Sequence, residues 1–151
     1  MLKTGDQAPD FTLPDENGAP FHLYTELKKA KLVLFFYPKD NTPGCTAEAC
    51  KFRDEYDLFL ENGAAVAGIS SDGFTSHSRF RNKYRLPFSL LSDSGREVAR
   101  LFGVPAFLGL FSGRVSFVID HDGRILHVFQ SQFNPEKHVD EALRVLRNQE
   151  G

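Results

Sequence analysis

With 151 residues, the chain has the length of one domain that buries about two-thirds of its surface, and we expect a single domain over residues 1–151. Its 18 basic and 20 acidic residues nearly balance, which argues against nucleic-acid binding and against a membrane role. The sequence lacks any run near the ~18 apolar residues of a membrane span and any apolar signal region at its start, so we expect a soluble, cytoplasmic protein. A chloroplast location is the alternative if the sequence is the mature form of a plant protein.

The first part of the chain predicts a hairpin and then a buried strand. Residues 11–13 and 21–23 are short apolar segments on either side of a turn-rich link, which predicts an N-terminal hairpin. Residues 32–37 are continuously apolar and rich in aromatic side chains, as in a strand that is buried on both faces. Pro38 ends this strand, because proline has no amide hydrogen for a β-ladder.

A helix is predicted directly after the next turn-rich stretch. Thr42 and Pro43 are typical of an N-cap and a first helical position, so Cys45 falls in the first turn of this helix. Apolar residues then recur at helical spacing and define one face: Cys45, Ala49, Phe52, Tyr56, Phe59 and Leu60. Gly63 is a typical residue beyond a helix end, so we expect one helix from residue 43 to about residue 61.

The remaining elements alternate between strands and helices. Their expected ranges are a helical turn at 25–29, strands at 65–70, 90–92, 115–120 and 125–129, and helices at 76–84, at 95–102 and from 134 onward. This order predicts an α/β fold with a mixed central sheet flanked by helices. It is compatible with a thioredoxin-like fold.

The stretch from residue 104 to residue 111 has apolar side chains without clean periodicity, between prolines and glycines. We favour a buried loop for it. The alternative is an exposed apolar patch that contacts a partner or a second copy of the chain.

The position of Cys45 favours the thiolate, which is the nucleophilic form of cysteine. A side chain in the first helical turn lies near unpaired backbone N–H groups and the positive end of the helix dipole. The dipole stabilises an anion by about 0.3–1 kcal/mol, or up to ~2 kcal/mol when partly buried, which leaves much of the thiol protonated at neutral pH. A reactive Cys45 therefore requires a nearby cation, and we expect an arginine from elsewhere in the fold.

Cys50 is the second of two cysteines and follows Cys45 by five residues. In an intact helix this offset turns about 140° and separates the two Cα atoms by roughly 8–9 Å, whereas a disulfide tolerates about 7 Å. Either the two cysteines never pair, or the first helical turns unwind when they do. The spacing fits neither the usual zinc clusters nor the Cys-x-x-Cys motif of thioredoxins. Two small buried core residues are the remaining alternative.

The segment around these cysteines resembles a known family. Pro38-x-x-x-Thr42-x-x-Cys45 is similar to the peroxidatic-cysteine signature of peroxiredoxins. A second cysteine five residues later is similar to their PrxQ subfamily, also called bacterioferritin-comigratory protein or atypical 2-Cys. The resemblance covers essentially the whole chain, including residues 5–13, 113–120 and 133–138. The stretch at 103–105 and the closing segment look most like the plant and cyanobacterial branch.

The resemblance implies a thioredoxin-like fold and a thiol-dependent peroxidase with a role in antioxidant defence. In this reaction, the thiolate of Cys45 attacks hydrogen peroxide or an alkyl hydroperoxide and becomes a sulfenic acid. Cys50 then condenses with it to an intramolecular disulfide, and thioredoxin or a similar dithiol restores both thiols. The resemblance implies no metal and no organic cofactor, and it favours a monomer.

The same resemblance assigns roles to the other site residues. Thr42 and the backbone N–H of Cys45 bind the peroxide oxygens, and Pro38 shields the thiolate from water. Arg114 supplies the cation, and Glu48 is a candidate helper. The alternatives are an N-cap role alone for Thr42, a strand-edge surface charge for Arg114 and an ordinary helix surface position for Glu48. The five histidines are scattered without ligand spacing and receive no role.

Two other functional classes stay open at this point. A disulfide reductase would use the same thioredoxin-like fold, but its Cys-x-x-Cys motif is absent from this sequence. A non-catalytic binding module would contain a Cys45 that is inert toward peroxide.

Overall fold

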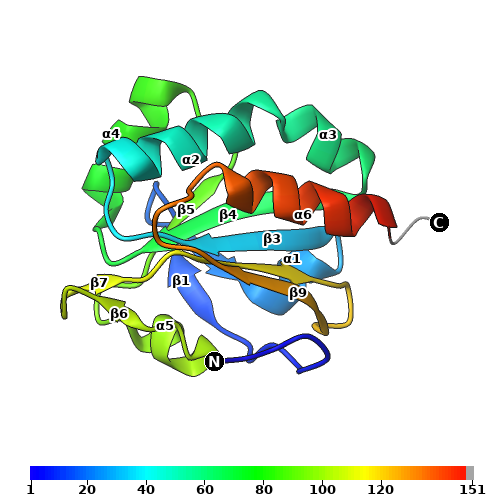
Figure 1. The fold of residues 1–151 in the computed structure, drawn as a ribbon. Coiled ribbons are helices and arrows are strands. Elements are labelled where there is room, and N and C mark those ends of the chain that lie inside the picture. Colours follow the sequence, from blue (N-terminus) through cyan, green and yellow to red (C-terminus); the bar gives the residue numbers. More distant parts are fainter. Residues whose placement is uncertain (149–151) are drawn as a thin grey trace.

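The computed structural model describes residues 1–148, and its core is a mixed sheet between two layers of helices (Figure 1). The strands of this sheet are β3 (Lys31–Phe36), β4 (Ala64–Ser70), β5 (Ser89–Ser92), β8 (Val115–Ile119) and β9 (Ile125–Gln130). Their order is β5-β4-β3-β8-β9, with β3 parallel to β4 and antiparallel to β8. The predicted mixed sheet is therefore confirmed, and each predicted strand agrees with the observed one to within one residue.

The helices cover both faces of the sheet. They are α1 (Leu23–Leu27), α2 (Pro43–Asp54), α3 (Tyr56–Glu61), α4 (Phe74–Tyr84), α5 (Glu97–Phe102) and α6 (Lys137–Asn148). α2, α3, α4 and α6 pack on one face, and α1 and α5 pack on the other (Figure 1). The starts of α1, α4, α5 and α6 differ from the predicted ones by two or three residues. Among residues 1–148, no helix is long and apolar enough to cross a membrane.

β3 is the central strand, and its two faces belong to two separate hydrophobic clusters. Leu34 and Phe36 pack in the cluster under α1 and α5. Val33 and Phe35 point the other way, into the cluster under α2, α3, α4 and α6. The ring of Phe35 stacks on Phe52 of α2 with 4.6 Å between the centroids. This stacking fixes α2 directly over the strand that leads into it, as the continuous apolar run predicts.

The helix predicted from residue 43 to about 61 consists of two helices, so the prediction of one continuous helix is wrong. Glu55, between α2 and α3, has φ −106° and ψ 13°, outside the helical region. The backbone hydrogen bonds nevertheless continue across it, from Glu55 N–H to Lys51 O and from Phe59 N–H to Glu55 O. The predicted apolar face is present at Phe52 and Phe59, which are both fully buried, but Leu60 is 53% exposed and does not belong to it. Apolar spacing indicates the buried face of a helix but cannot detect one residue that leaves the helical conformation.

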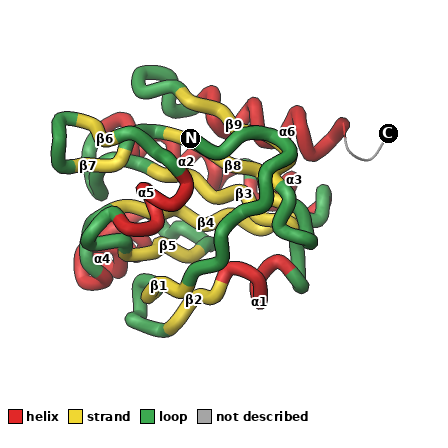
Figure 2. The backbone as a smooth tube through the Cα atoms, turned by 90° about the horizontal axis from the view of Figure 1, so that it is seen from below, coloured by secondary structure: helices red, strands yellow, loops and turns green. Residues whose placement is uncertain are grey.

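The predicted N-terminal hairpin is confirmed. It consists of β1 (Thr12–Pro14) and β2 (Pro20–His22), which are antiparallel with Leu13 opposite Phe21. The hairpin lies beside the β5 edge of the sheet, as Figure 2 shows from the side of α1 and α5.

A second hairpin replaces the buried loop that the sequence favours for residues 104–111. Its strands are β6 (Ala106–Phe107) and β7 (Phe111–Ser112). Leu108 and Leu110 are 76% and 72% exposed, so the buried-loop prediction is wrong. Leu108 and Gly109 have φ values of 55° and 75°, which close a tight turn between the two strands. The stretch is an exposed apolar hairpin.

Candidate active site

The loop between β3 and α2 delivers Thr42 to the start of the helix. Thr42 is in an extended conformation and Pro43 is the first residue of α2, so the predicted start of the helix is confirmed. The Thr42 side chain, however, does not cap the helix. Its hydroxyl donates to the backbone oxygen of Lys39 across 2.8 Å, which turns it away from the free N–H groups of the first turn.

The first turn of α2 brings Cys45 against a guanidinium group. Arg114 lies just before β8, and its Nη2 donates to Sγ of Cys45 across 3.5 Å. Cys45 is only 1% exposed and Arg114 is 5% exposed, so little water screens the contact. A buried cation beside the sulfur stabilises the thiolate, in addition to the N-terminal dipole of the helix. Arg114 is therefore a cation of the kind that the dipole argument requires.

Two hydrogen bonds hold the guanidinium of Arg114 in place. Its Nη1 donates to Oε1 of Glu48 across 2.7 Å, and its Nε donates to the backbone oxygen of Gln132 across 3.1 Å. Gly44 leaves room for it, because a Cβ at this position would lie 3.1 Å from Nη2. Burial alone would lower the pKa of Arg114, but the carboxyl of Glu48 and the sulfur of Cys45 outweigh burial and raise it.

Glu48 is fully buried on α2, so the surface alternative for this residue is wrong. Burial raises its pKa from 4.5 to about 8, although the charge of Arg114 opposes the shift. Its second oxygen, Oε2, has no hydrogen-bond partner and lies 3.7 Å from Nδ1 of His138. The carboxyl is therefore mainly neutral at neutral pH, and the positive charge of Arg114 remains available to Cys45.

His138 of α6 lies behind this carboxyl as a neutral ring. Its Nε2 faces the backbone oxygen of Ser131 at 2.9 Å and therefore carries the hydrogen. Its Nδ1 accepts from the hydroxyl of Ser116 across 2.8 Å. Burial lowers the pKa of His138 to about 4; its bond to Ser131 opposes this shift, whereas the charge of Arg114 adds to it. His138 thus offers Glu48 no positive charge at neutral pH.

A pocket with a volume of about 400 Å³ lies beside the contact between Cys45 and Arg114. Most of its lining is apolar and comes from the loop before α2, the β6–β7 hairpin and the segment before α6: Pro38, Lys39, Thr42, Gly44, Phe107, Leu108, Phe111, Arg114, Gln132, Phe133 and Pro135. Phe133 at its rim is 85% exposed. The site can therefore take a small molecule with an apolar portion.

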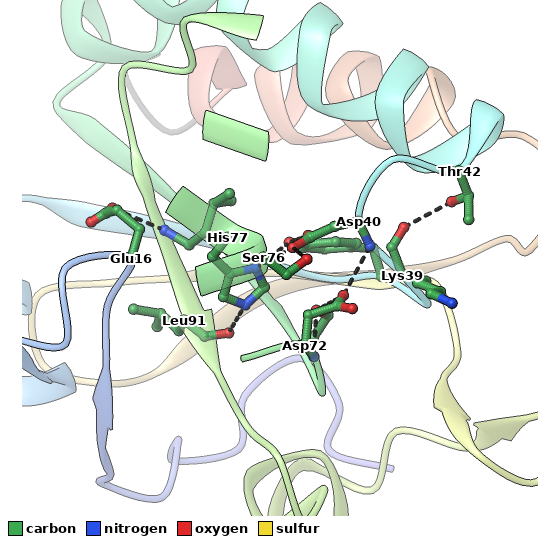
Figure 3. A network of polar contacts seen from close by, with 11 residues as sticks. Glu16, Lys39, Asp40, Thr42, Asp72, Ser76, His77 and Leu91 are labelled. Atoms are coloured by element: carbon green, nitrogen blue, oxygen red, sulfur yellow. Dashed lines mark hydrogen bonds and ion pairs between the residues drawn. The ribbon is translucent and has the colours of Figure 1, made fainter. Parts of the chain in front are cut away.

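Within residues 1–148, one group of side chains is close enough to hold a metal ion. It consists of Asp40, Asp72 and His77, whose candidate ligand atoms lie within 4.8 Å of one another. Figure 3 shows that these atoms are engaged with the protein itself, through hydrogen bonds to backbone and side-chain groups. The cluster fits a protein-bonded polar network better than a metal site.

Residues 4–128 match the sequence model of a family described as the AhpC/TSA family. The chain belongs to this family.

Two relatives of the chain are named chloroplastic peroxiredoxin Q. Chloroplastic peroxiredoxin Q of Arabidopsis thaliana is 49% identical over 147 residues, which cover 97% of this chain and 68% of that protein. Chloroplastic peroxiredoxin Q of Sedum lineare is 48% identical over 145 residues, which cover 95% of this chain and 77% of that protein.

Solved structures of peroxiredoxins are also similar to this chain. Peroxidoxin BcpB of Mycobacterium tuberculosis is 44% identical, with a TM-score of 0.93 and coverage of 98% of both chains. A cysteine-to-serine mutant of PrxQ from Xylella fastidiosa is 28% identical, with a TM-score of 0.89 and coverage of 100% and 99%. The thioredoxin-like fold is thereby confirmed. The chain is a peroxidase of the peroxiredoxin class, an oxidoreductase that uses a peroxide and a thiol reductant.

In this peroxiredoxin, α2 runs unbroken through Cys45 and Cys50, and both thiols are free. This agrees with the argument that five residues of intact helix hold them out of bonding range. Cys50 is half-buried, and burial raises the pKa of its thiol, with a smaller opposing contribution from Arg53. Cys50 is therefore mainly a neutral thiol at neutral pH, and it cannot reach Cys45 until α2 opens.

Sequence reasoning brought out Cys45 and Cys50 from local patterns, and the site roles of Thr42, Pro38 and Arg114 from the family resemblance. It assigned no role to His138, which lies directly behind Glu48. A signal was present, because His138 closes the segment 133–138 that resembles the family. The sequence alone does not reveal that α6 carries this residue back to α2.

Proposed function

We propose that the chain reduces hydrogen peroxide and alkyl hydroperoxides through Cys45, with Cys50 as the resolving residue. The observation that carries this proposal is the buried contact between Cys45 Sγ and Arg114 Nη2, at the start of a helix and beside an apolar pocket. It combines an anion-stabilising cation with a site for the substrate.

The thiolate of Cys45 attacks the terminal oxygen of the hydroperoxide. The S–O bond forms as the O–O bond breaks, and the departing alkoxide or hydroxide takes up a proton to leave as alcohol or water. Thr42 and the backbone N–H of Cys45 bind the peroxide oxygens, and Pro38 keeps bulk water from the sulfur. Arg114 stabilises the thiolate and the charge that develops on the oxygens.

Cys50 then attacks the sulfenic acid of Cys45, which forms the disulfide and releases water. This step requires α2 to unwind, because the intact helix separates the two sulfur atoms. An external dithiol of the thioredoxin type reduces the disulfide by thiol–disulfide exchange and returns both residues to thiols.

The pocket supports alkyl hydroperoxides as substrates in addition to hydrogen peroxide. Its apolar residues, among them Phe107, Phe111 and Phe133, can bury an alkyl group while the peroxide lies at Arg114. We further propose that the protein acts as a monomer. We place it in the cytoplasm, or in the chloroplast in the case of a mature plant protein, which the names of its chloroplastic relatives support.

A count of free thiols before and after one equivalent of peroxide tests this function. The reduced chain has two cysteines, and we expect both to disappear as one peroxide is consumed. Reduced thioredoxin should restore them. In Cys45→Ser, peroxide should leave the remaining thiol unreacted. Two intact thiols in the treated wild type would indicate a binding module instead.

A further inference from the structure

The loop between β3 and α2 is fixed by the buried carboxyl group of Asp40, which has three side-chain partners (Figure 3). The side chain of Asp40 accepts from the hydroxyl of Tyr37 across 2.5 Å and from the hydroxyl of Ser76 across 2.9 Å. It also pairs with Nδ1 of His77 across 2.7 Å. Asp40 is 5% exposed, so these bonds replace its hydration almost completely. None of these partners lines the pocket beside Cys45.

His77 connects this carboxylate to the sheet. It is fully buried, and its Nε2 lies 2.9 Å from the backbone oxygen of Leu91 in β5. A carbonyl oxygen can only accept, so Nε2 carries a hydrogen. Nδ1 lies 2.7 Å from Oδ2 of Asp40. The ring thus bridges β5 and the loop.

The backbone of the same loop is held from a third direction. The N–H of Asp40 donates to Oδ2 of Asp72 across 2.8 Å, and the hydroxyl of Ser70 donates to the same oxygen across 2.7 Å. Asp72 lies just beyond the end of β4. The Asp40 side chain and its peptide group are therefore both fixed, by residues from β4, α4 and β5.

The peptide that Asp72 holds also orients the hydroxyl of Thr42. The N–H of Asp40 and the C=O of Lys39 belong to one planar peptide unit, so a bond to the N–H sets the direction of the oxygen. That oxygen accepts the hydroxyl hydrogen of Thr42 across 2.8 Å. With its hydrogen committed there, Oγ1 of Thr42 presents lone pairs to the pocket that it lines.

We propose that Asp40, His77 and Asp72 form a positioning device that turns the Thr42 hydroxyl into a fixed acceptor for the O–H of the hydroperoxide. This rests on the proposed function, because it assigns Thr42 to the peroxide step. The bound peroxide donates its own hydrogen to Oγ1, which places the terminal oxygen in a defined direction from Cys45. The three residues act through the peptide between Lys39 and Asp40 and do not contact the substrate.

Asp72→Ala tests the device, because Asp72 is only half-buried and its replacement spares the core. In a Cys50→Ser background, we expect the rate constant of Cys45 with hydrogen peroxide to fall about 10- to 100-fold, as for a misplaced reacting group. Alkylation of Cys45 by iodoacetamide needs a thiolate but no oriented peroxide, and it should keep its wild-type rate. Asp72→Asn retains an oxygen that can accept both bonds, and it should restore most of the loss.

Two further variants separate an effect on the Thr42 hydroxyl from a general loss of stability. Glu16→Ala removes another carboxyl that is 5% exposed and bound to β5, at the N–H of Leu90, but is separate from the loop. It should lower the melting temperature without changing the ratio of the peroxide rate to the alkylation rate. In a Thr42→Val background, Asp72→Ala should cause little additional loss, because the hydroxyl that it orients is absent.

The proposal is overturned if Asp72→Ala leaves the peroxide rate unchanged, or if it lowers the peroxide rate and the iodoacetamide rate by the same factor. It is also overturned if the double variant Thr42→Val, Asp72→Ala loses as much rate as the two single variants combined. If Asp40→Ala folds, it should show the same selective loss of the peroxide rate. If it does not fold, the result for Asp72→Ala decides between the outcomes. A wild-type chain that fails to react with peroxide at Cys45 would refute the proposed function itself.

Discussion

Glu48 carries a fully buried carboxyl group that has a donor, Arg114, for only one of its two oxygens. An ionised form would place a negative charge on a buried group whose second oxygen is unsolvated and unpaired, which is unfavourable. The neutral form avoids the buried charge and also leaves the charge of Arg114 to Cys45. A carboxylate here would instead compete with the thiolate for one guanidinium.

The raised pKa of Glu48 makes stability depend on pH. The unfolded chain loses this proton near pH 4.5, whereas the folded chain keeps it until about pH 8, so the free energy of unfolding falls across that window. Glu48→Gln removes the titration. We expect its stability relative to the wild type to rise from pH 4.5 to pH 8, by about 1.4 kcal/mol for each unit of the pKa difference as an upper limit.

Urea unfolding at the two pH values measures this effect. Glu141→Gln is a suitable control, because Arg144 and His127 lower the pKa of that carboxyl instead of raising it. A stability difference for Glu48→Gln that does not change with pH would show that Glu48 is ionised in the folded protein.

At the scale of elements, the proposed mechanism requires α2 to be intact when Cys45 reacts with peroxide and to unwind when Cys45 and Cys50 form their disulfide. Intact, it places Cys45 against Arg114 and keeps Cys50 out of reach. Its last residue, Asp54, lies only four residues beyond Cys50, so the part that the proposed mechanism requires to open is short and separate from α3. Under the proposed mechanism, we therefore expect oxidation to disrupt one helix and to leave the sheet intact.

Hydrogen exchange tests this separation. After one equivalent of peroxide, we expect the amides of residues 43–54 to lose protection, because the disulfide cannot form in an intact helix. The amides of β3 should keep theirs. In Cys50→Ser, the same treatment should leave α2 protected, since no disulfide forms. Full protection of α2 in the oxidised wild type would contradict the unwinding step.

The β6–β7 hairpin lines one side of the pocket with apolar side chains, and Phe111 is the β7 residue that lines it. We expect Phe111→Ala to lower kcat/KM for cumene hydroperoxide about 10-fold relative to hydrogen peroxide, because only the bulky substrate uses that wall. Leu60→Ala, at an exposed leucine of α3, is the matched control and should leave the ratio of the two values as in the wild type. Equal losses for both substrates in Phe111→Ala would remove the hairpin from substrate selection.

The elements themselves were largely predictable, because their signals are local. The apolar run before Pro38 and the Thr42-Pro43 pair fix the strand and the helix start within one residue. The β6–β7 hairpin was not predictable in this way. Its apolar residues are exposed, which runs against the rule by which apolar residues predict burial.

At the scale of the whole molecule, the two layers of helices depend on close packing at the centre of the sheet. Gly68 of β4 shows how tight this packing is. A Cβ there would lie 2.8 Å from the ring of Phe35 and 3.0 Å from Leu90 and Tyr37. We expect Gly68→Ala to destabilise the fold by about 1–3 kcal/mol, as overpacked core positions do.

Chemical unfolding of Gly68→Ala measures this cost. Gly95→Ala is the control, because a Cβ at that position meets only the Glu97 side chain, at 3.7 Å and beyond. Equal stability of the two variants would show that the sheet can relax around the added methyl group.

The contacts that complete the site are long-range, and this is why sequence reasoning reached them only in part. Arg114 lies 69 positions from Cys45 and was identified only through the family motif. His77 lies 37 positions from Asp40, and no local pattern relates the two. Periodicity indicates which face of an element is buried, but the partner on the opposite side follows from the assembled fold.

The central claim is that the contact with Arg114 activates Cys45 toward peroxide, and the rate constant of Cys45 with hydrogen peroxide measures this most directly. In a Cys50→Ser background, we expect Arg114→Ala to lower this rate constant about 100-fold or more. Arg114→Lys should lie between the two, because it keeps the charge but not the paired geometry. A rate constant in Arg114→Ala equal to that of the parent would contradict the account.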